Sequence, residues 1–205
     1  MAGKFESTTK KKWPWIAGII VLAMIIAAVL VRCSGDSKGV PILTVETPQK
    51  LSAANTEDFT LDVTISDLGN VRYPAMSMSI RFDSSRLEFL GVQEGNVFIY
   101  DDTNGVGQQL PDWSCNVKNS NDTGLINIMY LDMTGGKYAF SRELLAEDNN
   151  VVLRLRFRLR GSVRSGDVLD VTLEDAVFAA SDETQSLAMT LGTLRTKNGK
   201  IVIGD

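Results

Sequence analysis

The sequence predicts an all-β sandwich with one short helix, preceded by a single N-terminal transmembrane helix. Apolar and polar residues alternate with a period of two over residues 59–66, 75–82 and 153–160, which is the pattern of strands that bury one face and expose the other. Clusters of turn-forming residues separate such stretches at short intervals, as they do in two-sheet sandwiches and jelly rolls. An uncharged apolar run near the N-terminus predicts the membrane helix.

The first forty residues predict a membrane anchor. Residues 16–31 carry no charge, and Trp15 extends the run to 17 apolar residues, at the short end for a helix that spans a bilayer. Lysines 10–12 precede the run, so we expect the basic end in the cytoplasm and the C-terminal body outside the cell. The expected organisation is a cytoplasmic segment at 1–14, a transmembrane helix at 15–32, a linker at 33–41 and a folded domain at 42–205.

A cleaved signal peptide is the alternative for this segment, because its basic and apolar regions come in the same order. No A-x-A-like site of small residues follows Val31. Arg32 stands directly before Cys33, where a lipoprotein signal needs a small residue. These residues favour an uncleaved, single-pass anchor in the cell membrane.

The body is expected to contain about nine strands and one short helix. Ser141 begins a segment with an acidic residue early in its first turn and two leucines after it, which predicts a helix of about two turns over 141–147 at one end of the sandwich. No repeat and no second domain is evident. The expected strands are 42–46, 59–66, 75–82, 87–93, 113–117, 125–131, 153–160, 168–178 and 199–203.

Composition excludes several classes of function. The chain has no histidine, and its two cysteines, Cys33 and Cys115, form no CxxC pair; this disfavours His-based catalysis and zinc or iron–sulfur sites. Residues 41–205 carry 15 basic and 23 acidic side chains, a poor balance for binding nucleic acid. Glu174 and Asp175 are adjacent in an expected strand, which should point them to opposite faces. We therefore expect no enzyme activity.

Four collinear segments between about residues 43 and 204 resemble a cohesin domain. Residues 81–89, RFDSSRLEF, resemble the turn after the family's third strand and the Leu-Glu pair of the fourth, and Gly95 matches the glycine that ends that fourth strand. Residues 125–140, 151–182 and 199–205 resemble later strands. The resemblance implies a nine-stranded jelly-roll β-sandwich outside a bacterial cell. It also implies a dockerin-bearing partner from a polysaccharide-degrading assembly, with calcium held by that partner and no cofactor in this chain.

The resemblance implies a docking face that includes the strands 75–82 and 125–131. Many members of the best-known type carry Asn and Asp at the places of Ala75 and Ser77. This chain has neither, so either its partner belongs to another specificity class or docking is lost. The expected partner-binding residues are Ala75, Ser77, Ser79, Arg81, Asn127, Met129, Leu131 and Asp132.

Other features leave alternatives open. The row Arg154, Arg156, Arg158 and Arg160 fits an anionic partner, or a solvated face whose charges pair with acids such as Asp58 and Asp62 on a neighbouring strand. Trp113 fits a partner anchor or the core. A carbohydrate-binding module needs a strip of exposed aromatic rings, and a structural envelope component would use the sandwich as a spacer. The available aromatic residues are Tyr73, Tyr100, Trp113, Tyr130 and Tyr138.

Overall fold

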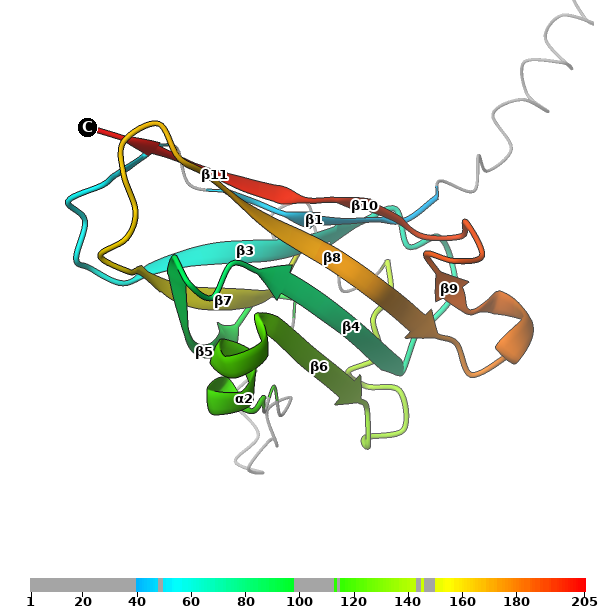
Figure 1. Ribbon diagram of the computed structural model, residues 1–205. Coiled ribbons are helices and arrows are strands. Elements are labelled where there is room, and N and C mark those ends of the chain that lie inside the picture. Colours follow the sequence, from blue (N-terminus) through cyan, green and yellow to red (C-terminus); the bar gives the residue numbers. More distant parts are fainter. Residues whose placement is uncertain (1–39, 48–49, 98–112, 114, 143–144, 146–149) are drawn as a thin grey trace, which may run out of the picture. The chain divides into compact units, whose positions relative to one another are not determined.

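Two β-sheets that lie face to face form the body of the protein (Figure 1). The computed structural model describes residues 40–47, 50–97, 113, 115–142, 145 and 150–205. The first sheet has the strand order β10 (Arg195–Lys197), β1 (Ile42–Val45), β3 (Phe59–Ser66), β7 (Val151–Leu159) and β5 (Leu87–Glu94). The second has the order β2 (Leu51–Ser52), β11 (Gly199–Gly204), β8 (Val168–Ala179), β4 (Ala75–Phe82) and β6 (Leu125–Leu131), and β9 (Leu187–Ala188) pairs with β8.

The period-two pattern of the sequence builds both sheets. In β4, Met76, Met78 and Ile80 are at most 2% exposed, while the residues between them face outward. In β6 the same alternation buries Ile128 and exposes Met129. Because successive side chains of a strand point to opposite faces, each sheet presents one apolar face to the other.

Aromatic side chains fill the space between the sheets in two groups. Phe82, Phe89 and Phe157 pack with ring centroids 5.3 to 6.2 Å apart. At the other end, Trp113 stacks on Tyr130 at 5.2 Å. Trp113 is only 7% exposed, so it belongs to the core. Each such ring contributes about 1.5–3 kcal/mol to folding through burial alone.

The strand expected at 113–117 is wrong. Trp113, Cys115 and Asn116 lie outside any strand, and Val117 begins the helix α2 (Val117–Thr123). The Asn116 side chain accepts a hydrogen bond from the Asn119 N–H at 3.0 Å and so caps the helix N-terminus. Gly124 ends the helix with a φ of +68°. An Asn cap and a terminal Gly eight residues apart were the sequence signal for this helix.

The expected number of strands differs from the structure, in which the described residues contain eleven. The other eight expected strands are present. The additional ones are β2, β9 and β10, of two or three residues each, too short to show an alternating pattern. Most of the helix expected at 141–147 lies outside the described residues; within it, the Leu145 N–H donates to the Ser141 carbonyl at 3.3 Å. A single 3₁₀ turn, η2 (Glu183–Gln185), follows β8.

The chain divides into two units, Met1–Lys38 and Gly39–Asp205. The expected transmembrane helix at 15–32 lies in the first unit, outside the described residues. Among the residues that are described, no helix combines the length and the apolar character needed to cross a bilayer.

Candidate functional site: the outer face of β8, β4 and β6

The candidate site is the outer face of three neighbouring strands, β8, β4 and β6, which we call the β4–β6 face. Antiparallel pairing places Ala75 opposite Leu131, Ser77 opposite Met129 and Ser79 opposite Asn127. On the other side of β4, Ala75 lies opposite Ala179 and Ser77 opposite Val177. The register therefore brings the expected outward residues of both strands into one patch, with Arg81 at its far end.

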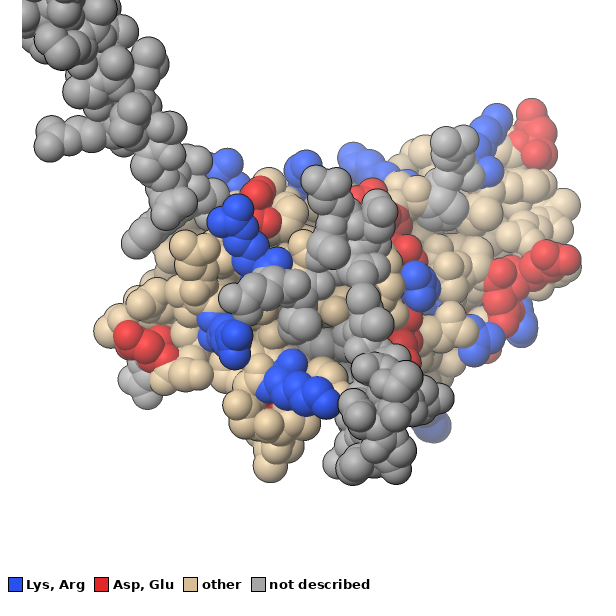
Figure 2. Space-filling model, turned by 180° about the vertical axis from the view of Figure 1, so that it is seen from behind, with Lys and Arg blue, Asp and Glu red and all other residues tan. Residues whose placement is uncertain are grey.

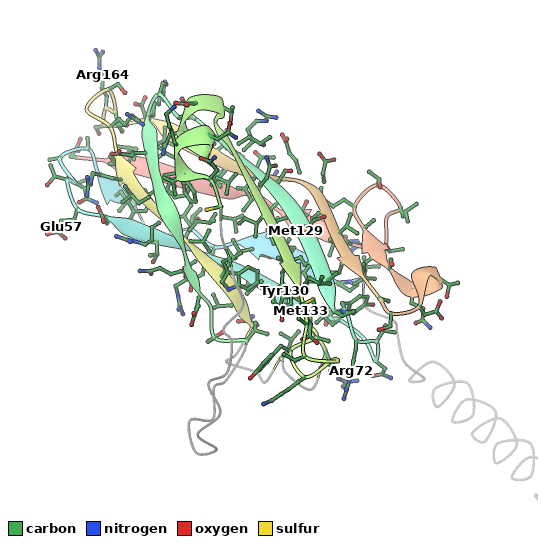
Figure 3. All side chains as sticks on the ribbon, turned by 90° about the horizontal axis from the view of Figure 1, so that it is seen from below. Glu57, Arg72, Met129, Tyr130, Met133 and Arg164 are labelled. Carbon is green, nitrogen blue, oxygen red and sulfur yellow. The ribbon has the colours of Figure 1, made fainter. Side chains whose placement is uncertain are left out.

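One end of the β4–β6 face is apolar. Met129, Leu131 and Met133 are 74%, 58% and 82% exposed, and Met129 and Met133 are labelled on β6 and just beyond it in Figure 3. A shallow hollow lies beside them, whose outward lining includes Ala75, Met129, Leu131, Val177 and Ala179. Large apolar side chains gathered around one hollow are typical of a contact surface, whereas single exposed ones are ordinary.

The other end of the β4–β6 face is polar. The Arg81 guanidinium makes two hydrogen bonds to the Glu174 carboxylate, at 2.8 and 3.0 Å. The bond from Arg81 is the main cause that holds the pKa of Glu174 below its ordinary value. Next to this pair, the Ser79 hydroxyl donates to Asn127 Oδ1 at 2.8 Å. Arg81 is thus engaged by its own sheet, and Glu174 joins the site although the sequence did not identify it.

A β-bulge adds Asp175 to the same face. Between Ser77 and Ser79 the register of β8 gains one residue, since these partners pair with Val177 and Glu174. Asp175 takes up the extra position with a φ of +49°, a left-handed conformation that Asp tolerates better than most residues. Glu174 and Asp175 therefore both lie on the outer face, and the expectation that they point to opposite faces is wrong.

Asp132 has a structural task at the end of β6. Its carboxylate accepts hydrogen bonds from the Thr134 N–H at 2.8 Å and the Gly136 N–H at 2.7 Å, and from the Thr134 hydroxyl. Partial burial acts to raise the pKa of Asp132, but these bonds outweigh it and hold the pKa below its ordinary value. The side chain closes the turn that follows Leu131, so it shapes the apolar end of the face. A direct contact with a partner stays a prediction.

The arginine row lies on the outer face of the other sheet. Arg154 contacts Asp62 at 3.2 Å, while Arg156 and Arg158 share Asp58 at 2.9 and 2.6 Å. Figure 2, seen from behind the view of Figure 1, shows basic and acidic side chains beside one another on that side of the body. Arg160 donates to the Leu87 carbonyl at 3.3 Å. Three of the four arginines therefore pair with acids of β3 or the residue before it, as the pairing alternative predicted.

The described residues hold no group of three potential metal-ligating side chains of the His, Cys, Asp or Glu type. Cys115 is a half-buried free thiol beside the core, and burial is the main cause that raises its pKa. Such a thiol is a poor nucleophile at neutral pH. What the β4–β6 face offers chemically is a firm surface with apolar, neutral polar and acidic zones.

The chain belongs to the cohesin domain family, because the family model for the cohesin domain matches residues 44–201. None of the curated proteins compared with the chain matches it.

Solved cohesin structures share the fold. A chain of the OlpC cohesin–dockerin complex from Clostridium thermocellum matches with a TM-score of 0.58 and 14% identity, over 83% of this chain and 98% of that one. The sixth cohesin of scaffoldin B from Acetivibrio cellulolyticus, in complex with the Cel5 dockerin, gives 0.57 and 16%, over 80% and 99%. The third cohesin of ScaC from the same organism, in complex with the ScaB dockerin, gives 0.55 and 13%, over 80% and 99%. At these identities the matches establish the fold.

Proposed function

We propose that the protein is a docking module whose β4–β6 face binds a dockerin-bearing protein without covalent chemistry. Membership in the cohesin family and the dockerin complexes of solved relatives support this function. The observation in this chain that carries it is the exposure of Met129 and Leu131 beside one hollow on a sheet face, with the exposed Met133 just beyond the end of β6. Ala75 and Ser77 leave β4 flat and uncharged there, so docking relies on apolar contact where the best-known type uses amide and carboxylate groups.

The physical basis of binding is desolvation of the apolar end of the face. Burying apolar surface contributes about 25 cal/mol per Å², and a few central side chains carry most of the binding energy at such interfaces. β4 pairs with β6 along nearly its whole length and with β8 on both sides of the bulge, so the surface is preorganised. We expect little change in the backbone of the module on binding. Calcium would be held by the dockerin.

The module would act at the cell surface. Residues 15–32 would anchor the chain in the cell membrane and 33–41 would hold the body close outside it. The uncharged run and the lysines before it support this arrangement. A dockerin-bearing polysaccharide-degrading enzyme, or a scaffold that carries such enzymes, would thereby be tethered to the bacterial surface.

The observed burial of aromatic residues disfavours the carbohydrate-binding alternative. Tyr73, Trp113, Tyr130 and Tyr138 are at most 7% exposed, and Tyr100 lies outside the described residues. A sugar-stacking strip needs such rings on the surface. The envelope-spacer alternative predicts no dockerin binding and is separated by the experiment that follows.

A dockerin panel tests the docking function. The full chain, purified in detergent, is immobilised and exposed to calcium-loaded dockerins, including those encoded in the same genome, with a chelator-treated series beside it. We expect at least one dockerin to bind in calcium. Leu131→Asp should weaken that binding about 30-fold, since a central contact is worth about 2 kcal/mol.

Leu191→Asp is the matched control, because Leu191 is 72% exposed and lies in the loop after β9. It should bind within about twofold of the unchanged chain. If no dockerin binds, the docking function is wrong. If Leu131→Asp and Leu191→Asp lose the same amount of affinity, the β4–β6 face is not the docking surface.

A further inference from the structure

We infer that α2 closes the outer edge of β5, with Asn121 in the place of a neighbouring strand, and that this closure keeps a second copy of the chain from adding a strand of its own there. Within the described residues, β5 is the last strand of the first sheet. An edge strand presents unpaired N–H and C=O groups, which are a template for pairing with another chain. The closure concerns the sheet opposite the β4–β6 face and stands apart from the proposed docking function.

The composition of β5 makes an open edge hazardous. Between residues 87 and 92 the only charged residue is Glu88. The same stretch holds four large apolar side chains, Leu87, Phe89, Leu90 and Val92. Short apolar strands of low charge are the ones that pair with one another in aggregates. An exposed edge along β5 would therefore favour association of two copies.

Asn121 occupies both edge groups of Phe89. Its side chain accepts a hydrogen bond from the Phe89 N–H at 2.9 Å and donates one to the Phe89 carbonyl at 2.8 Å. Phe89 lies opposite Phe157 of β7. Because opposed residues of an antiparallel pair exchange either both backbone bonds or neither, the two groups of Phe89 point away from β7. A further strand would make this same pair of bonds, so Asn121 takes the place of one of its residues.

The Asn121 side chain is itself held in position by its helix. Its Nδ2 also donates to the Val117 carbonyl, one turn earlier, at 3.0 Å. The helix packs against both β5 and β6 (Figure 1), and the Asn116 cap and Gly124 fix its two ends. A helix of 7 residues is too short to be stable by itself, so this packing and these caps keep it over the edge.

Other parts of the β5 edge are occupied by groups of the same chain. The Leu87 N–H donates to the Asp83 carbonyl at 2.8 Å, and the Leu87 carbonyl accepts from Arg160 at 3.3 Å. Further along, a bulge shifts the register of β5, and past it the Val92 backbone makes a hydrogen bond to the Cys115 thiol. Bulges and covering segments are the means by which natural sheets avoid edge pairing. Asn121 covers the middle of the strand.

The test uses substitutions in the full chain, purified in detergent. Asn121→Ala removes both bonds to Phe89. Asn121→Gln keeps an amide, but one methylene further out, where it does not match both groups; it decides the question if Asn121→Ala does not fold. The matched control is Asn119→Ala, since Asn119 is exposed on the same helix and its side chain makes no hydrogen bond within the described part of the chain.

A second control, Ile201→Val, separates edge pairing from a general loss of stability, because Ile201 is a fully buried residue of the other sheet. Melting temperatures verify that every variant folds. All measurements are made well below the lowest of them. They are the hydrogen exchange rate of the Phe89 amide, the sedimentation coefficient and the binding of thioflavin T.

Both Asn121 variants should exchange the Phe89 amide at least about tenfold faster than the unchanged chain. At about 0.1 mM they should form larger particles that bind thioflavin T. Asn119→Ala and Ile201→Val should keep the sedimentation coefficient of the unchanged chain. Leu90→Lys, added to Asn121→Ala, should restore that coefficient without restoring the protection of the Phe89 amide, because a charge on an edge strand opposes pairing between copies.

Unchanged exchange of the Phe89 amide in the folded Asn121 variants overturns the inference. So does association no greater than that of Ile201→Val, or association that Leu90→Lys leaves in place. None of these results bears on dockerin binding, and a panel in which no dockerin binds leaves the closed edge standing.

Discussion

The outer face of β7 and β3 and the outer face of β8, β4 and β6 belong to one sandwich but differ in what they leave unsatisfied. On the first, Arg154, Arg156 and Arg158 have carboxylates from β3 or the residue before it. On the second, Met129 and Leu131 are exposed and Asp175 has no cation among the described residues. Three arginines of the charged row are paired with carboxylates of their own sheet, whereas the β4–β6 face leaves apolar side chains and one carboxylate available to a partner.

The difference shows that the number of charges on a surface is a weak sign of function. Exposed ion pairs contribute at most about 1 kcal/mol each, and a paired row offers little to an incoming anion. Apolar side chains in water, by contrast, gain on contact with any complementary apolar surface. The side chains that a face leaves without a partner of its own indicate which chemical groups a binding partner would supply.

The largest expected effect comes from disturbing the close packing between the end of β5 and the start of β7, in the sheet that carries the arginine row. A Cβ added at Gly95 would lie 1.8 Å from the Val151 carbonyl oxygen, so the chain between β5 and β7 would have to move. We expect Gly95→Ala to reduce the free energy of unfolding by at least about 3 kcal/mol. Urea denaturation measures this.

Gly161→Ala is the control for that change, because a Cβ there meets nothing within 4 Å. It should be nearly neutral. A Gly95→Ala variant as stable as Gly161→Ala would contradict the close packing at the end of β5.

A smaller effect is expected from a substitution in the turn that follows β6, at the apolar end of the β4–β6 face. Asp132→Asn leaves one acceptor oxygen for bonds that now use both carboxylate oxygens, and it removes the charge that strengthens them. Unfolding free energy should fall by about 1 kcal/mol. Asp122→Asn, which loses an exposed ion pair with Lys118, should change it by much less. If urea denaturation gives the same loss of unfolding free energy for both variants, the hydrogen bonds of Asp132 contribute no more to stability than an exposed ion pair.

The smallest effect is expected from removing the Asp58 carboxylate from the ion pairs on the outer face of β7 and β3. The hydrogen bond from Arg158, opposed by partial burial and helped by Arg156, holds the pKa of Asp58 below its ordinary value of 3.8. Because the folded pKa is the lower one, Asp58 stabilises the fold above the ordinary pKa, and this contribution is lost as the pH falls through the folded pKa.

Thermal melts of the unchanged chain and of Asp58→Asn should therefore differ by a constant amount above about pH 5 and converge below about pH 4. Dockerin binding by the variant should be unaffected. A gap that widens toward acid pH would contradict the pairing of Asp58 with the two arginines.

Much of the fold follows from the sequence because half-buried strands carry a period of two. Residues 75–82 and 125–131 show it plainly, and they form β4 and β6. The segment around Trp113 alternates with Cys115 and Val117 and yet forms no strand, because the cap at Asn116 starts a helix. Three residues of alternation were too few to distinguish these outcomes.

For the candidate site, the sequence predicted only which side chains of β4 and β6 face outward. Ser77 and Met129 were expected to face outward, and the register makes them direct neighbours. The role of Asp175 was hidden, because a bulge reverses the direction of side chains and leaves no periodic trace. The pairing of Arg154 with Asp62 could be anticipated, since both lay on strands expected to be neighbours.

Oxidative footprinting of the full chain with and without a bound, calcium-loaded dockerin tests the central claim most directly. Met129 and Met133 are well exposed and their thioethers react readily with hydroxyl radicals, while Leu191 and the partly exposed Phe59 on β3 serve as references elsewhere. Docking on the β4–β6 face predicts that the dockerin protects Met129 and Met133 and leaves Leu191 and Phe59 unchanged. Protection of Phe59 with both methionines still oxidised at their free rates would contradict it.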